Sequence, residues 1–218
     1  MLDLIIKNGK CFIEGELKDA NIGIKDGKIQ DIGQISNNSK DTIDAKGLIV
    51  LPGCIDTQTH FREPGSTDTE DLHSGSRAAV AGGITAVFEM PNTNPPTSNK
   101  KEFQRKLDLA KNRMFCNYAF YFGATADNVN ELAELKNLEG CCGIKLFAGS
   151  STGNLLVADE KDIEKVFQNS SKVVAVHSED EEILNNNKKL IKNGDVHSHP
   201  VWRSAECAIS STRRIVKI

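Results

Sequence analysis

Apolar and polar residues follow two different patterns along the chain. In the N-terminal part, apolar residues alternate with polar neighbours in short runs, as around Ile22, and this period of two predicts β-strands. Asn8-Gly9 and Asp26-Gly27 are typical of hairpin turns, and Lys46-Gly47 predicts another turn. Residues 1–50 therefore predict a small β module.

From about residue 48, apolar runs alternate with helical patterns, as they do in parallel βα units. Asn99 and Asp159 are placed to cap two of the predicted helices. The last helix begins at Ser204, and its inward face is expected to carry Ala208, Ile209, Thr212 and Ile215. The predicted strands are 48–51, 84–90, 115–122, 143–147 and 172–177, and the first of them, Leu48-Ile49-Val50-Leu51, is expected to be buried.

These strands and helices make about five βα units, fewer than a closed (β/α)8 barrel requires. Five parallel strands could also form an open doubly wound sheet. However, no glycine-rich loop of the dinucleotide-binding type follows any predicted strand. The fold class predicted from the pattern is therefore α/β, with an incomplete (β/α)8 TIM barrel.

Composition narrows the classes of partner. A net charge of −3 and a pI near 6.0 give no basic surface for nucleic acid or an acidic membrane. No apolar stretch approaches the length of a bilayer span, and the N-terminus lacks the features of a signal peptide. The six cysteines form no C-x-x-C pair, so we expect reduced thiols in a cytoplasmic protein.

Side chains with chemical potential follow several of the predicted strands. Gln58, His60 and Arg62 come after the first, Asn92 follows the second, and His177 ends the fifth. In α/β barrels the catalytic groups lie at these strand ends, and neutral imidazole is a common metal ligand. The arrangement predicts a metal-dependent hydrolase. Either histidine could instead be structural, and the asparagine could be a turn residue.

Lys145 is unusual because it stands between Ile144 and Leu146 in a predicted central strand. Burial would disfavour its charged form and lower its pKa. A neutral buried amine can react with carbon dioxide to give a carbamate, which is an anionic ligand able to bridge two metals. Alternatively, Lys145 pairs with a buried carboxylate or reaches the rim of the barrel.

Several motifs follow one another along nearly the whole chain: Leu51-Pro52-Gly53-Cys54-Ile55-Asp56, His60-Phe61-Arg62-Glu63-Pro64-Gly65, Ala81-Gly82-Gly83-Ile84-Thr85, Met90-Pro91-Asn92-Thr93, Gly143-Ile144-Lys145-Leu146-Phe147 and Val176-His177-Ser178-Glu179. Together they resemble the dihydroorotase branch of the amidohydrolase superfamily. The resemblance implies a zinc-dependent (β/α)8 barrel with a composite β-sandwich built from both chain ends. Residues 1–50 would be the N-terminal part of the β-sandwich, and residues 51–218 a partial barrel.

Members of this branch interconvert L-dihydroorotate and N-carbamoyl-L-aspartate in pyrimidine biosynthesis. The resemblance implies that His60 and His177 bind one or two Zn²⁺ ions and that Lys145 is a carboxylated, bridging ligand. Arg62 and Asn92 would hold the substrate carboxylate, a role that suits the arginine fork. The Arg-Glu-Pro-Gly run favours dihydroorotase over dihydropyrimidinase and allantoinase, whose substrates lack that carboxylate.

Two departures from the family pattern stand out. The family usually has a histidine where this chain has Gln58, and an amide oxygen is a poorer zinc ligand than imidazole. We therefore expect Gln58 to be at best a weak ligand, with one metal site weak, empty or rearranged. The family's remaining metal-binding histidine and its catalytic aspartate are expected beyond Ile218. This portion alone is accordingly predicted to be inactive and to expose apolar sheet edges.

Two other functions compete with this interpretation. One is a non-catalytic dihydroorotase homologue that serves as a structural partner of aspartate transcarbamoylase. Gln58 favours it, whereas the presence of Lys145, His177, Arg62 and Asn92 together argues against it. The other is a hydrolase of the dihydropyrimidinase or hydantoinase type. The expected partners are a small-molecule substrate and either further copies of the chain or aspartate transcarbamoylase, with no nucleic acid and no membrane.

Overall fold

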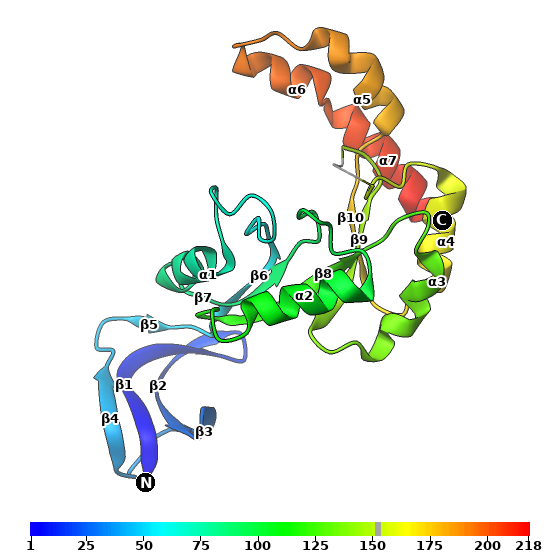
Figure 1. The fold of residues 1–218 in the computed structure, drawn as a ribbon. Coiled ribbons are helices and arrows are strands. Elements are labelled where there is room, and N and C mark those ends of the chain that lie inside the picture. The colour runs from blue at the N-terminus through cyan, green and yellow to red at the C-terminus, as the bar shows by residue number, and fades with distance from the viewer. Residues whose placement is uncertain (151–153) are drawn as a thin grey trace. The chain divides into compact units, whose positions relative to one another are not determined.

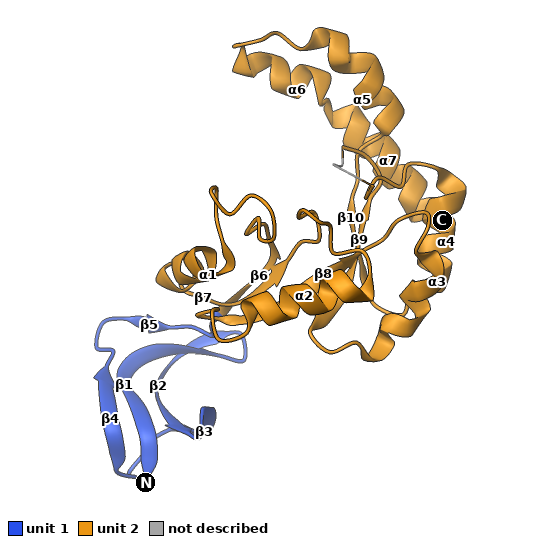
Figure 2. Ribbon diagram, viewed as in Figure 1, with its two compact units in different colours: residues 1–53 blue, residues 54–218 orange. Residues whose placement is uncertain are grey.

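The computed structural model describes residues 1–150 and 154–218, and the chain forms two compact units. Unit 1 comprises residues 1–53 and unit 2 residues 54–218 (Figure 2). Among the helices of the described residues, none has the length and apolar character of a membrane span.

Unit 1 is a five-stranded sheet in the order β3-β2-β1-β4, with β5 also paired to β1. The pairs β1–β2 and β2–β3 are antiparallel, whereas β4 and β5 run parallel to β1. The sequence pattern therefore predicted the β character of this unit correctly. Its strands are β1 Leu2–Ile13, β2 Glu16–Lys25, β3 Lys28–Gly33, β4 Ser39–Asp44 and β5 Ile49–Val50.

The turns of unit 1 agree only in part with the prediction. Asp26-Gly27 and Lys46-Gly47 are turns, as expected. Asn8-Gly9 is not a turn but a bulge inside β1, where the register with β2 shifts and Asn8 adopts a φ of 63°. The β1–β2 turn is Glu14-Gly15, with φ angles of 53° and 86°. A Cβ on Gly9 would lie 2.6 Å from the Val50 side chain, so the glycine lets β5 pack closely against β1.

The predicted first barrel strand is wrong. Leu48 and Leu51 are about 60% exposed (62% and 60%), and the residues between them form β5 in the sheet of unit 1. Pro52 follows immediately; it lacks an N–H group and restricts the residue before it, so the pairing stops there. The first barrel strand is β6 (Cys54–Thr59) instead.

Unit 2 is built on a curled sheet of five parallel strands in the order β10-β9-β8-β7-β6 (Figure 1). Each strand is followed by helical structure, which confirms the incomplete TIM barrel of five βα units. The strands after β6 are β7 Ile84–Glu89, β8 Asn117–Gly123, β9 Cys141–Phe147 and β10 Val174–His177. The helices are α1 Leu72–Ala81, α2 Lys100–Ala110, α3 Val129–Leu132, α4 Glu160–Asn169, α5 Glu181–Asn187, α6 His199–Trp202 and α7 Ala205–Lys217, with short 3-10 helices at Ala133–Asn137, Lys188–Leu190 and Val196–Ser198.

The core of unit 2 lies between this sheet and its helices. On β9, Ile144 and Leu146 are fully buried against helix residues such as Leu132 and Ile163. Strand side chains alternate between faces, so Lys145 points to the opposite face, the interior side of the partial barrel. The helix layer thus accounts for the apolar neighbours of this lysine.

Local signals set the ends of the helices. The Asn99 side chain accepts a hydrogen bond from the Glu102 amide (2.9 Å), and Asp159 accepts one from the Lys161 amide (2.9 Å). Both predicted N-caps are confirmed. Each cap satisfies an amide that would otherwise lack a partner in the first turn of its helix.

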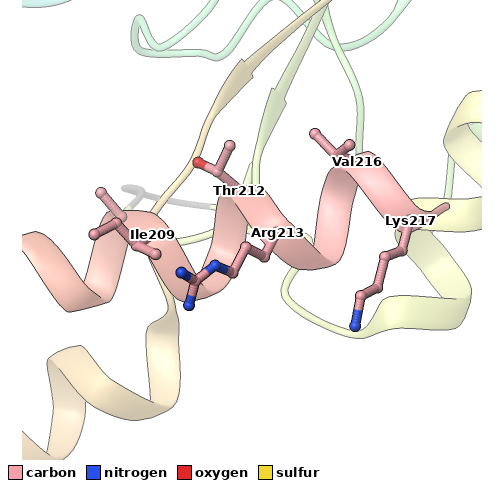
Figure 3. A pocket seen from close by; sticks show the side chains of 6 residues that line it. Ile209, Thr212, Arg213, Val216 and Lys217 are labelled. Atoms are coloured by element: carbon pink, nitrogen blue, oxygen red, sulfur yellow. The ribbon is translucent and has the colours of Figure 1, made fainter.

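Of the residues predicted to face inward on α7, Ile215 packs against the core as expected, but Ala208, Ile209 and Thr212 are exposed. The buried residues of this helix are Cys207 and Ser211, whereas Ala208, Ile209, Thr212 and Val216 line an open apolar groove (Figure 3). Polar contacts orient the helix: the Cys207 thiol lies 3.3 Å from the Asp180 carbonyl oxygen, and Ser211 contacts Ser178 at 3.0 Å. Apolar periodicity therefore placed only Ile215 correctly.

Candidate active site at the carboxyl ends of the barrel strands

The predicted functional residues of unit 2 lie on or just after its strands. His60 follows β6, Asn92 follows β7, Lys145 is in β9, and His177 is the last residue of β10. Because the strands are parallel, their carboxyl ends share one edge of the sheet. This is the edge at which barrel enzymes carry their chemistry.

His60 and Asn92 are in direct contact. The imidazole Nδ1 lies 2.9 Å from the Asn92 side-chain oxygen, which can only accept, so Nδ1 carries the proton and Nε2 keeps a free lone pair. Burial and the nearby charge of Arg62 lower the pKa of His60, with further lowering by Lys145 and Lys106. The ring is therefore held in the neutral form that binds metals.

Lys145 is almost completely buried, with 3% of its surface exposed. Its Nζ lies 5.1 Å from the centre of the Phe147 ring, and no carboxylate of the described residues forms an ion pair with it. The alternative of a buried carboxylate partner is therefore not realised. Burial lowers the pKa of Lys145, which favours the uncharged amine.

His177 is the neighbour of Phe147 across the β9–β10 pair, and their rings stack with centroids 6.0 Å apart. Its Nε2 lies 2.6 Å from Glu179 Oε2. Since Val174 and Val176 pack against the helix-side core, alternation places His177 on the barrel-interior face, as it does Lys145.

Glu179 and Arg203 complete this part of the site, and the sequence analysis missed both as site residues. Glu179 accepts a hydrogen bond from Arg203 Nε (2.9 Å), and Arg203 Nη2 also contacts it. Burial alone would raise the pKa of Glu179, but Arg203 and His177 hold it below its usual value. The position of Glu179 two residues after His177 was a usable signal. Arg203, 24 residues further along, gave none.

Arg62 and Gln58 are exposed. Arg62 adopts a φ of 62°, in the left-handed region that few non-glycine residues occupy. Gln58 lies on β6 with its backbone amide bonded to Asp56 Oδ1 (2.9 Å). Within the described residues, no hydrogen bond joins the Gln58 side chain to His60, Lys145 or His177.

Glu63 belongs to the Arg-Glu-Pro-Gly run, but the sequence assigned it no role in the site. It is buried and accepts two hydrogen bonds from Arg113 (2.8 and 3.2 Å) and one from the Leu72 amide (2.9 Å). The loop that carries Arg62 is thereby fixed to the first turn of α1 and to the segment after α2.

The metal ligands have to come from mixed residue types. Among residues 1–150 and 154–218, no three His, Cys, Asp or Glu side chains form a group that could hold a metal ion. The candidate donors are His60, His177 and Lys145. Neutral imidazole and a buried amine without a counter-ion fit zinc in their chemistry, provided that the amine is first converted to an anionic ligand.

Known proteins resemble the chain in sequence and in fold. The chain is 36% identical over 225 residues to the dihydroorotase of Methanosarcina mazei, covering 100% of this chain and 49% of that protein. It is 34% identical over 226 residues to an allantoinase of Escherichia coli, covering 98% and 50%. The structure matches the L-hydantoinase (dihydropyrimidinase) from Arthrobacter aurescens with a TM-score of 0.91 at 27% identity, covering 100% and 50%.

The chain therefore spans about half the length of the relatives that it matches. Residues 49–211, which include every strand and almost every helix of unit 2, match the Amidohydrolase family. The chain is a member of the amidohydrolase family.

Proposed function

We propose that the protein is a zinc-dependent cyclic amidohydrolase of the dihydroorotase type, which interconverts L-dihydroorotate and N-carbamoyl-L-aspartate in pyrimidine biosynthesis. The observation that carries the proposal is the buried amine of Lys145, which has no carboxylate partner in the described residues and shares the barrel-interior face with His177. The relatives named dihydroorotase, allantoinase and hydantoinase support a cyclic amide as the class of substrate.

Three side chains would hold the metal. His60 would bind through Nε2, because Asn92 occupies Nδ1. His177 would use the ring nitrogen that does not contact Glu179. The uncharged Nζ of Lys145 adds to carbon dioxide and loses a proton, and the resulting N-carboxylate supplies anionic oxygens. Zinc held by these residues would supply an activated hydroxide near neutral pH and would polarise the amide carbonyl.

Arg62 and Asn92 are the candidates for recognising the substrate carboxylate. The Asn92 oxygen is engaged by His60, so its NH₂ group remains available as a donor. The exposed guanidinium of Arg62 can supply a two-pronged contact to a carboxylate. Asn92 would then link the metal ligand to the substrate by orienting both.

A hydantoinase-type activity is the second candidate, since a hydantoinase structure superposes with a TM-score of 0.91. Only the dihydroorotase activity needs a cationic side chain that binds the carboxylate of the substrate, because hydantoin carries no carboxylate. A non-catalytic role is a third candidate, suggested by Gln58 in the place of a ligand histidine.

Ligand binding is the appropriate test, because the chain spans about half the length of its relatives. Calorimetry of the zinc-loaded protein would compare L-dihydroorotate and N-carbamoyl-L-aspartate with hydantoin and allantoin. We expect Arg62→Ala to weaken binding of the two acids at least about tenfold, with hydantoin unaffected, and Arg77→Ala, at an exposed arginine of α1, to change nothing. Equal affinity for hydantoin, insensitive to Arg62→Ala, would favour the hydantoinase.

Two measurements test the metal centre without using activity. Elemental analysis should find zinc in the purified protein, and a protein free of zinc after zinc-supplemented expression would favour the scaffold. Carbon-13 NMR with labelled bicarbonate should show a carbamate signal that is absent from Lys145→Ala and present in the control Lys172→Ala. A signal that persists in Lys145→Ala would remove the bridging ligand from the proposal.

A further inference from the structure

A buried ion pair lies behind the candidate site, on the helix side of the sheet. Glu89 is the last residue of β7 and has the same side-chain direction as the core residue Val87. It pairs with Lys106 of α2, and the two side chains are 1% and 0% exposed. Neither residue belongs to the set of metal and substrate ligands described above.

Each member of the pair lies beside one of the two segments that carry His60 and Asn92. Lys106 Nζ donates a hydrogen bond to the carbonyl oxygen of Met90 (2.9 Å), two residues before Asn92. The backbone amide of Phe61, the residue between His60 and Arg62 in the chain, lowers the pKa of the Glu89 carboxylate and therefore lies close to it. The pair is therefore hydrogen-bonded to the backbone on the Asn92 side of the His60–Asn92 contact and lies close to the backbone on the His60 side.

Further hydrogen bonds connect the end of β6 to the end of β7. The Met90 amide donates to the Thr59 carbonyl oxygen (2.9 Å), and the Thr59 hydroxyl lies 3.3 Å from the Phe88 carbonyl oxygen. The ends of β6 and β7 are thus joined by one backbone bond and one bond from a side-chain hydroxyl, and Lys106 binds the same Met90 residue. A shift of either segment would alter the separation of His60 and Asn92.

Stability does not explain why charges are used here. Two apolar side chains of similar volume often stabilise a core as well as a buried ion pair does, because both ions lose their hydration. Burial raises the pKa of Glu89 to about 7, although Lys106 and the Phe61 amide oppose the shift, and burial lowers the pKa of Lys106. What charges add is direction, since they fix hydrogen-bond donors and acceptors at defined points.

We propose that Glu89 and Lys106 are positioning residues, which hold the His60-Phe61-Arg62 and Met90-Pro91-Asn92 segments in the register that lets His60 and Asn92 meet. The pair acts through the backbone of these segments and touches no ligand. The inference depends on the geometry of the rim and holds for whichever cyclic amide the protein binds.

The test replaces the ions by apolar groups of similar size, as Glu89→Leu/Lys106→Met. The control is Lys100→Met/Glu134→Leu, which removes an exposed ion pair that also involves α2. In the metal-free protein, NMR would follow exchange of the Phe61 amide hydrogen and the side-chain NH₂ signal of Asn92. Urea unfolding would follow stability.

For the apolar variant we expect unchanged or higher stability, at least about tenfold faster Phe61 exchange, and an Asn92 signal that moves toward that of a solvated asparagine. The control should match the wild type in both NMR measurements. A stable apolar variant with wild-type Phe61 and Asn92 signals would overturn the proposal.

If the apolar variant does not fold, the variant Glu89→Gln/Lys106→Met tests the same positioning role. The side-chain oxygen of the introduced glutamine can still accept a hydrogen bond from the Phe61 amide, so in this variant exchange at Phe61 should stay within a few-fold of wild type. Because Lys106→Met removes the donor to Met90, the Asn92 signal should still move. An unchanged Asn92 signal would again overturn the proposal. These readouts use no substrate, so failure of the proposed dihydroorotase activity would leave them intact.

Discussion

The imidazole of His60 and the side-chain amide of Asn92 lie 2.9 Å apart across the ends of β6 and β7. The contact fixes which ring nitrogen is protonated, and it leaves the other free for a metal. Partners of this kind tune metal ligands even though they do not bind the metal themselves. Asn92 therefore has a structural part in the candidate site besides its proposed contact with substrate.

Removing this amide should weaken metal binding. We expect Asn92→Ala to lower zinc affinity by about 10- to 100-fold, because the His60 ring would lose both its orientation and its preferred tautomer. Competition titration with a chromogenic chelator would measure the affinity. Asn94→Ala, at an exposed asparagine of the same loop, should keep wild-type affinity, and equal losses in the two variants would count against this role.

Gly75 of α1 should not tolerate a methyl group. A Cβ at this position would lie 2.4 Å from the ring of Phe61. Phe61 is buried, and in the sequence it stands between His60 and Arg62. We expect Gly75→Ala to lower the free energy of unfolding by about 1–3 kcal/mol, measured by urea denaturation. Gly82→Ala is the matched control at the end of the same helix, where the nearest atom is 3.5 Å away and φ is −87°. A neutral effect at Gly75 would mean that the Phe61 ring can move aside.

The Glu179–Arg203 pair should stabilise the protein in a pH-dependent way. Arg203→Met is expected to cost about 1–3 kcal/mol at pH 7, since the pair is largely buried. The pKa of Glu179 is below its usual value: burial opposes this, but Arg203 and His177 dominate. A carboxylate with a depressed pKa contributes stability above its unfolded pKa and loses it as the pH falls through the folded one.

The difference between wild type and Arg203→Met should therefore be complete at pH 7 and shrink below about pH 4. Urea denaturation at several pH values would measure it. Arg213→Met, at an exposed arginine of α7, should stay within about 0.5 kcal/mol of wild type at every pH. A difference that persists undiminished in acid would show that Arg203 stabilises through packing and not through its charge.

The apolar groove of α7 should promote self-association. Val216 is 79% exposed and Ile209 41% exposed, and contiguous apolar surface of this kind is a liability in water. We expect Ile209→Lys/Val216→Lys to reduce association in sedimentation velocity, with the free energy of unfolding within about 0.5 kcal/mol of wild type. Val196→Lys, at a valine that is 78% exposed but outside the groove, should associate as the wild type does. Equal behaviour of all three proteins would exclude the groove as the contact surface.

The parts of the fold that depend on neighbouring residues were predictable from the sequence. The caps at Asn99 and Asp159 involve amides two or three residues away, and the strand containing Lys145 carries its own alternation. Asn8-Gly9 misled because the same residue pair serves a bulge when another strand packs on the glycine. That packing partner, Val50, lies too far along the chain for a local rule to detect.

The candidate site likewise contains residues that the sequence predicts and residues that it does not. Its strand-end residues could be identified from their positions, whereas their supports come from pairs that are distant in sequence. Glu63 meets Arg113 50 residues later, and Glu179 meets Arg203 24 residues later. Only the folded chain brings such groups together, so no spacing in the sequence identifies them.

Because side chains alternate along β9, the face on which Lys145 lies depends on the exact number of residues that precede it in the strand. Ile144 and Leu146 fill the helix side, and Lys145 between them faces the barrel interior. Losing or gaining a single residue early in this strand would exchange the two faces, so that an ammonium group would point into the apolar core and a leucine toward the proposed metal ligands. Length variation among related proteins should therefore be confined to the loops that flank this strand.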